Sequence, residues 1–256
     1  MATTFNDAAE QYDVVRPGYP REMFDDLERL SGLRRGSRVL EVGCGTGQAT
    51  QCFAERGYRV VCVDPGGALL GVAKRKLAGR PVEFYESRFE DWQSSGRFDA
   101  VASGTAWHWV DPLVAYTKAA TAIKEDGFLA LFWNLHPPPY TGFFEATQRV
   151  YGTVVPEWGD PRGRPSLEQR INSISAEIES SGWFKEPIIR RYSWSRTYSK
   201  LDYLRLLDTY SDHRGLPENK KRRLYYGIAR LIDEEYGGSV ERPYLTALFV
   251  AGKAPR

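Results

Sequence analysis

Three glycines, Gly43, Gly45 and Gly47, follow an apolar run that contains an acid near its end, Glu41. Glycines at this density allow positive φ angles and a close approach of the backbone to a ligand. Residues 38–42 have the pattern of a strand and residues 48–56 that of a helix, so the loop amides and the start of the helix would face the ligand. The segment predicts a small-molecule site at this turn.

The spacing of the glycines narrows the type of ligand. A dinucleotide fingerprint places its third small residue at position 48, where this chain has Gln48, and the third glycine falls at Gly47 instead. The carboxylate of Glu41 would also repel a pyrophosphate at the end of the strand. The pattern suits a ligand that carries an ammonium and a sulfonium.

A second acid, Asp64, follows a β-branched run at residues 60–63, about 20 residues beyond the glycine loop. An acid at the carboxyl end of the neighbouring strand can accept hydrogen bonds from both ribose hydroxyls, as it does in dinucleotide folds. The alternative is an aspartate that only caps its own loop. Because the glycine loop lies next to it, the ribose interpretation is preferred.

The whole segment 39–48, read as VLEVGCGTGQ, resembles the first motif of class I S-adenosylmethionine-dependent methyltransferases. Residues 12–20 (YDVVRPGYP) and 104–111 (GTAWHWVD) resemble elements of the type 11 methyltransferases and of trans-aconitate methyltransferase-like proteins. The resembling stretches cover residues 5 to about 135. The resemblance implies S-adenosyl-L-methionine as cofactor and S-adenosyl-L-homocysteine as product.

The same resemblance implies which positions form the site. Phe89 departs from the family pattern, in which a small residue is common beside the adenine. The substrate-binding residues are expected to be aromatic: Tyr19, Trp107, Trp109 and Trp133. The implied cofactor-binding residues are Tyr12, Arg16, Glu41, Gly43, Cys44, Gly45, Thr46, Gly47, Asp64, Pro65, Phe89, Glu90, Ser103, Gly104 and Ala106.

His108 is the candidate catalytic residue. It follows the fourth expected strand, where the family's chain passes near the methyl group, and an imidazole with a pKa near 6.5 can take a proton at neutral pH. A phenol or hydroxyl acceptor would need such a base, whereas a carboxylate would need only positioning. The alternative is a histidine that caps a turn and packs between Trp107 and Trp109.

Other charged and ligating residues have competing interpretations. Arg16 is either a surface charge or the partner of the cofactor's carboxylate. The basic run at residues 220–223 is interpreted as the solvated face of a helix, and His136 and His213 as structural or surface residues, because neither has a second ligand at metal spacing. No metal is expected.

Composition excludes several classes of protein. The 256 residues include 35 Lys and Arg and 33 Asp and Glu, a net charge of +2 that gives no general attraction to nucleic acid or to a membrane surface. The N-terminal residues lack the pattern of a secretory signal, and Cys44, Cys52 and Cys62 lack paired spacing. A protein of the cytoplasm with reduced thiols is expected.

Aromatic residues make up 13% of the chain and are dense after residue 130. They predict either an aromatic core or the wall of a pocket for an apolar or planar ligand.

Strands and helical patterns alternate in the first half of the chain, which predicts an α/β fold. We expect a Rossmann-like seven-stranded sheet, mostly parallel with an antiparallel last strand, under a helical, aromatic-rich cover. The expected division is a cofactor-binding core at 1–135, a substrate cover at 136–243 with a sixth strand at about 187–198, and the last strand at 244–256. The segments 136–186 and 199–238 are expected over one end of the sheet, after a break at prolines 137–139. The other strands are expected at 38–42, 59–63, 82–85, 98–102 and, after a turn at Asp126-Gly127, 128–133.

The sequence therefore predicts methyl transfer to oxygen, nitrogen or carbon of a small molecule. Three alternatives stay open: a cofactor-containing cyclase or rearrangement enzyme on the same fold, a nucleic-acid methyltransferase and a non-catalytic binding protein. The second would favour an Asn-Pro-Pro-aromatic sequence after the fourth strand, where this chain reads Ser103-Gly104-Thr105-Ala106. The acceptor and the oligomeric state are not indicated.

Overall fold

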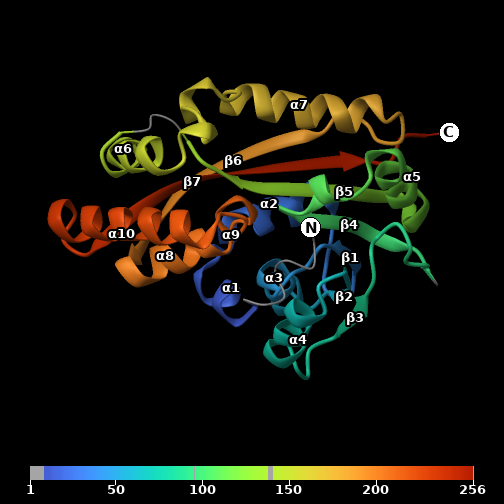
Figure 1. Ribbon diagram of the computed structural model, residues 1–256. Coiled ribbons are helices and arrows are strands. Elements are labelled where there is room, and N and C mark those ends of the chain that lie inside the picture. The colour runs from blue at the N-terminus through green and yellow to red at the C-terminus, as the bar shows by residue number, and fades with distance from the viewer. Residues whose placement is uncertain (1–8, 95, 138–140, 256) are drawn as a thin grey trace.

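A seven-stranded sheet organises the computed structural model, which describes residues 9–94, 96–137 and 141–255 (Figure 1). The strand order is β3-β2-β1-β4-β5-β7-β6. The first five strands pair in parallel, and β7 runs antiparallel to both β5 and β6, which confirms the predicted sheet. The strands are β1 (Arg38–Val42), β2 (Arg59–Asp64), β3 (Val82–Glu86), β4 (Phe98–Gly104), β5 (Ile123–Leu135), β6 (Ile188–Ser199) and β7 (Ser239–Gly252).

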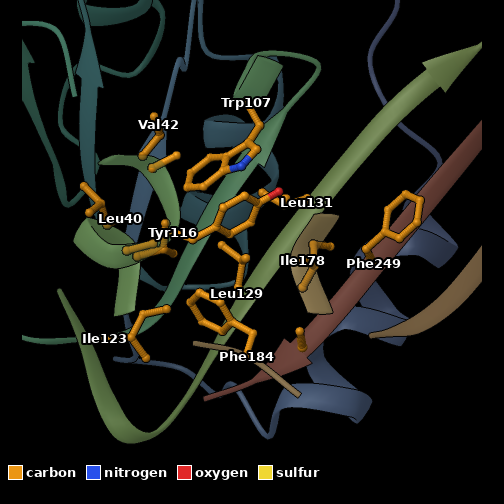
Figure 2. Packing of buried hydrophobic residues seen from close by; sticks show 14 of the residues in the cluster. Leu40, Val42, Trp107, Tyr116, Ile123, Leu129, Leu131, Ile178, Phe184 and Phe249 are labelled. Atoms are coloured by element: carbon orange, nitrogen blue, oxygen red, sulfur yellow. The ribbon is translucent and has the colours of Figure 1, made fainter. Parts of the chain in front are cut away.

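Helices cover both faces of the sheet, because the strands are apolar on both sides. On one face, side chains of α5 and α7 pack on β1, β4, β5 and β7, as Figure 2 shows for Tyr116, Leu131 and Ile178. On the other face lie α2 and α3, with Phe24 and Phe53 in the core. The helices are α1 (Ala9–Val15), α2 (Arg21–Ser31), α3 (Gln48–Glu55), α4 (Gly67–Lys76), α5 (Pro112–Ala122), α6 (Phe143–Val154), α7 (Leu167–Ser180), α8 (Lys200–Asp208), α9 (Ser211–Arg214) and α10 (Glu218–Glu235), with 3₁₀ turns η2 (Trp107–Trp109), η3 (Pro156–Trp158) and η4 (Pro161–Gly163).

The helical cover forms a hydrophobic core of its own where β6 ends and β7 begins. Side chains of α6, α8 and α10 pack there around Tyr198, Tyr203 and Tyr244, and Figure 1 shows these helices gathered together. Most of the late aromatic residues thus serve as core, while Tyr210 and Tyr244 also reach a cavity. The expectation that residues 136–186 all lie over this end is wrong for α7, whose Ile171 and Ile178 are buried on the face of the sheet.

Two strand starts also differ from the prediction. The Asp126-Gly127 pair lies inside β5, which begins at Ile123 and is irregular opposite β4. A Cβ at Gly127 would come within 2.8 Å of the Asp99 carbonyl, so the glycine is required by close packing and makes no turn. At the other end, β7 begins at Ser239 and includes Pro243, which is tolerated because β5 ends opposite Leu245 and leaves that edge open.

The predicted proline break follows the end of β5 at Leu135, but Pro138 and Pro139 lie outside the described residues. Within the described parts of the chain, no helix is long and apolar enough to cross a membrane.

Candidate functional site

The glycine loop joins β1 to α3 in a conformation that only glycine accepts without strain. Gly43, Gly45 and Gly47 have φ angles of 73°, 55° and 82°. A Cβ at Gly43 would lie 2.3 Å from the Cβ of Ala106, because the loop packs directly on the chain that follows β4. A side chain at Gly43 would therefore have no room, while the backbone of Gly43 and Gly45 borders the cavities described below.

Asp64 ends β2 and ties the glycine loop to the next loop. Its Oδ2 accepts a hydrogen bond from the amide of Gly45 at 2.9 Å, and its Oδ1 accepts one from the amide of Gly66 at 2.7 Å. Burial raises the pKa of the Asp64 carboxyl, and the two amides oppose this rise. Each carboxylate oxygen has a further lone pair, so Asp64 can still accept bonds from a ligand.

Glu41 lies in β1 and is 2% exposed. Its Oε2 accepts a hydrogen bond from the Thr50 hydroxyl of α3 at 2.7 Å. Burial raises the pKa of Glu41 to about 8, although the bond from Thr50 lowers it. A cationic ligand beside Glu41 would favour the ionised carboxylate.

These groups border a cleft of two adjacent cavities, of about 950 Å³ and about 230 Å³, which have several lining residues in common. The larger volume is at the upper end of the range for small-molecule sites. The structure brings most of the predicted site residues to the cleft: Tyr12, Arg16, Tyr19, Glu41, Gly43, Cys44, Gly45, Asp64, Pro65, Phe89, Glu90, Gly104, Ala106, His108 and Trp109.

Five predicted residues do not line the cleft and support its walls instead. Ser103 donates to the carbonyl of Val42 at 2.8 Å, which ties β4 to β1. Thr46 is buried, and Gly47 precedes α3. Trp107 is buried between Phe89 and Tyr116 in the core that Figure 2 shows, and the indole of Trp133 packs on Phe249.

His108 lines the larger cavity and is linked to Trp133. The Trp133 indole N–H donates to His108 Nδ1 over 3.4 Å, a long hydrogen bond. Burial and the positive charge of Arg170 lower the pKa of His108, so the ring is neutral at pH 7. Because Nδ1 accepts, the proton of the neutral ring is on Nε2, and His108 offers its other partner a donor.

Arg16 connects α1 to the cover. Its guanidinium lies 4.8 Å from the ring centre of Tyr12 and 4.6 Å from that of Tyr210. It donates to the carbonyl of Thr209 at 3.0 Å, and its Nε is buried with no hydrogen-bond partner among the described residues. Arg16 is thus no free surface charge, because it holds together two segments far apart in sequence.

Thr105 is a site residue that sequence reasoning missed, although it stands between the predicted Gly104 and Ala106. Its φ is 55°, a strained value for a β-branched residue. Its hydroxyl is 3.1 Å from that of Tyr19, and its amide donates to the carbonyl of Phe132. The signal was its place in the signature of residues 104–111.

Other missed residues come from distant segments. Arg170 of α7 and Tyr210 border both cavities, and Asn134 and His136 border the smaller one. The interpretation of His136 as structural omitted its place at the cleft, whereas His213 is buried between Tyr151 and Asp212, as expected of a structural residue.

We call the side formed by Glu41, Asp64 and Glu90 the sheet wall, and the side formed by Arg170 and Tyr210 the cover wall. Among the residues that the structure describes, no three His, Cys, Asp or Glu side chains gather in a group that could hold a metal ion.

Comparison with known proteins gives consistent results. Residues 40–131 match a family model described as a methyltransferase domain. An uncharacterized methyltransferase of Mycobacterium tuberculosis is 32% identical over 200 residues, which are 77% of this chain and 78% of the relative. The ubiquinone biosynthesis O-methyltransferase of Aromatoleum aromaticum is 32% identical over 108 residues, 40% of this chain and 46% of the relative.

Two solved structures bear on the fold. A candidate type II methyltransferase of Anaeromyxobacter dehalogenans matches with a TM-score of 0.62 and 22% identity over 94% of this chain and 97% of that one. Phosphoethanolamine N-methyltransferase 2 of Haemonchus contortus, in complex with phosphomonomethylethanolamine and S-adenosylhomocysteine, matches with a TM-score of 0.55 and 16% identity. That match covers 98% of this chain and 58% of the other.

Proposed function

Because the chain belongs to the class I S-adenosylmethionine-dependent methyltransferases and its cofactor is S-adenosylmethionine, we propose that it methylates a small molecule bound in the cleft. The observation that carries the proposal is the cleft itself, whose larger cavity of about 950 Å³ has the size of a small-molecule site and is bordered by the glycine loop, Asp64, Arg170 and Tyr210. The narrower grouping with trans-aconitate methyltransferase-like proteins and the location in the cytoplasm stay predictions.

The residues present fit the cofactor. Asp64 offers carboxylate lone pairs to ribose hydroxyls, and Glu41 offers a buried acid near the smaller cavity, as a ligand with two cationic centres requires. Gly43 and Gly45 border both cavities, so backbone of the glycine loop is available to the ligand there. Phe89 and Glu90 border the larger cavity, as Asp64 does, and are proposed beside the adenine. Arg16 borders both cavities and is proposed near the carboxylate of the cofactor.

The bound cofactor supplies a methyl group on a sulfonium, and the protein's part is to position the acceptor and exclude water. Tyr12, Arg16 and Tyr210 close the cleft from the side of α1 and the cover. His108 donates through Nε2 and so positions an oxygen of the acceptor. A base role for His108 is less favoured. The nitrogen that could take up a proton is Nδ1, and its lone pair already accepts a hydrogen bond from Trp133.

A nucleic-acid acceptor is not favoured by the basic run on α10. Lys220 pairs with Glu157, Lys221 with Asp208 and Arg222 with Glu218. These residues act as the solvated face that the sequence predicted, and their ion pairs leave little cationic surface on that run to bind phosphates.

The proposal is tested by incubating the enzyme with methyl-labelled S-adenosylmethionine and a small-molecule extract of host cells. We expect one labelled small product by mass spectrometry, formed together with S-adenosylhomocysteine. The Asp64→Ala variant serves as the control, because its weaker cofactor binding should reduce the labelled product. Formation of S-adenosylhomocysteine without a labelled product, or label found only in nucleic acid, would contradict the proposal.

A further inference from the structure

Arg170 is a cation at the cleft with no protein partner among the described residues. It lies in α7, borders both cavities, and lowers the pKa values of His108 and His136 through its charge. None of the three acids of its own helix pairs with it: Glu168 pairs with Arg191, Glu177 accepts from Tyr116, and Glu179 lies more than two turns further along α7. The cover wall thus presents an unpaired guanidinium to whatever enters the cleft.

A second cation is buried behind the same wall. Arg242 is 6% exposed and lies among the rings of Phe144, Tyr203, Tyr210 and Tyr244, with ring centres 5.6–5.8 Å away. It donates to the hydroxyl of Tyr203 and contacts Nε2 of His136, a wall residue of the smaller cavity.

Arg242 has no acid as partner in the described parts of the chain, and its Nε makes no hydrogen bond. A buried charge without an acid partner is unfavourable, and the surrounding aromatic rings offset only a part of that cost. An anion at the cleft would offset the remainder.

Among the described residues, Asp64, Glu41, Glu90 and Asp212 border the cleft, and none of these acids forms an ion pair with Arg170 or Arg242. Asp64 accepts from two amides, Glu41 accepts from Thr50, Glu90 pairs with Arg88, and Asp212 pairs with His213. The cofactor's own carboxylate is proposed near Arg16, whose guanidinium lies against the rings of Tyr12 and Tyr210. The two arginines at and behind the cover wall therefore have no acid partner among the described residues.

We propose that the methyl acceptor carries a carboxylate and that this group binds Arg170 on the cover wall. The inference rests on the proposed methyl transfer and names the chemical class of its acceptor. The planar guanidinium can bind both oxygens of a carboxylate, and the Nε2–H of His108 is a second donor in the same cavity. Arg242 adds a fixed positive potential that a neutral acceptor would not use.

The test divides a small-molecule extract of host cells by anion exchange at pH 7. Each fraction is incubated with enzyme and methyl-labelled S-adenosylmethionine, and one portion of each is first treated with alkaline phosphatase. We expect acceptor activity only in retained fractions, unchanged by phosphatase. Activity in the unretained fraction would overturn the inference, and so would activity that phosphatase abolishes, because the anion would then be a phosphate ester.

Variants assign the anion to Arg170. With the active fraction as acceptor, Arg170→Gln is expected to raise KM at least tenfold with kcat within threefold, and Arg170→Lys to raise it less. The matched control, Arg223→Gln, removes an exposed arginine of α10 that lies outside the cleft and should leave KM unchanged. Equal KM values for Arg170→Gln and Arg223→Gln would overturn the assignment.

Calorimetry with S-adenosylhomocysteine separates the two proposals. All variants should bind it within twofold of the wild type, which also shows that they fold. If it binds and no fraction is methylated, the proposed methyl transfer fails and the inference fails with it. If methylation occurs but only on neutral or basic acceptors, the inference fails alone.

Discussion

The sheet wall and the cover wall of the cleft differ in charge and in the way they are assembled. Glu41 and Asp64 stand on neighbouring strands joined by one helix, and their oxygens are bonded to Thr50 and to loop amides. Arg170 lies in α7 and Tyr210 between α8 and α9, two segments far from β1 and β2 in sequence, and Arg170 has no partner among the described residues. The acids Glu41 and Asp64 of the sheet wall have hydrogen-bond partners within the protein, whereas Arg170 of the cover wall is left to bind a ligand.

The difference teaches where affinity and specificity arise. A wall whose polar groups already hold each other in place is preorganised, so it binds a constant ligand with little ordering cost. A wall built from side chains on separate segments can change between related proteins without loss of the sheet. We therefore expect changes in the sheet wall to affect the cofactor and changes in the cover wall to affect the acceptor.

The largest effect is expected at the glycine loop. Gly43→Ala should weaken S-adenosylmethionine binding by roughly a hundredfold or more, because the new Cβ would overlap Ala106 and force the loop out of place. Gly36→Ala is the matched control, since Gly36 also has a positive φ but has open space around it. It should cost about 1 kcal/mol of folding free energy and leave the affinity unchanged. Calorimetry that gives equal affinities for the two variants would contradict this view of the loop.

Asp64→Ala comes next. It should weaken S-adenosylmethionine binding by about 2–3 kcal/mol, because charge-assisted hydrogen bonds to the ribose are lost. Titration calorimetry measures the change directly. Asp126→Ala removes an exposed acid far from the cleft and should have no effect. Affinity unchanged by the loss of Asp64 would remove it from the ribose site.

His108 lies between the two walls, and its variants distinguish a donor from a base. His108→Ala should lower kcat by more than tenfold, while the affinity for the cofactor stays within a few-fold. Gln can donate from the position of Nε2 but cannot accept a proton, so His108→Gln should recover most of kcat if the ring only donates. A kcat as low for His108→Gln as for His108→Ala, with a lost inflection in the pH profile, would restore the base role.

The smallest effect concerns the pH dependence of stability. Folded Glu41 keeps its proton up to about pH 8, whereas the unfolded chain releases it near 4.5. Between these values the folded state holds more protons, so the contribution of Glu41 to the free energy of unfolding falls as the pH rises. Glu41→Gln removes this loss and should raise Tm by roughly 2–4 °C per kcal/mol recovered.

Thermal unfolding of the free protein tests this sign. The Tm of the Glu41→Gln variant minus that of the wild type should grow from pH 5 to pH 8 and then level off. A constant difference across this range would show that Glu41 titrates normally. Added S-adenosylmethionine should reverse the order, because a cationic ligand favours the ionised carboxylate of the wild type.

The sequence alone determined the parts of this protein that are local in the chain. Strand, glycine turn and helix at residues 38–56, the acid at the end of β2, and the place of His108 after β4 follow from short-range pattern, because the carboxyl ends of parallel strands meet at one edge. The family and the α/β sheet with an antiparallel β7 were predicted on the same basis and are confirmed. The local signals erred where a glycine or a proline lies inside a strand, since Gly127 is required by close packing and Pro243 is tolerated at an open edge.

Only the tertiary structure decided which distant residues share the cleft. The packing of α7 on the face of the sheet puts Arg170 at both cavities, and the aromatic cover buries Arg242 without an acid partner among the described residues. It also gives Thr105 its strained φ and sets Trp133 beside His108, which fixes the proton on Nε2. Such contacts depend on how helices dock on the sheet, and residue spacing along the chain does not specify that docking.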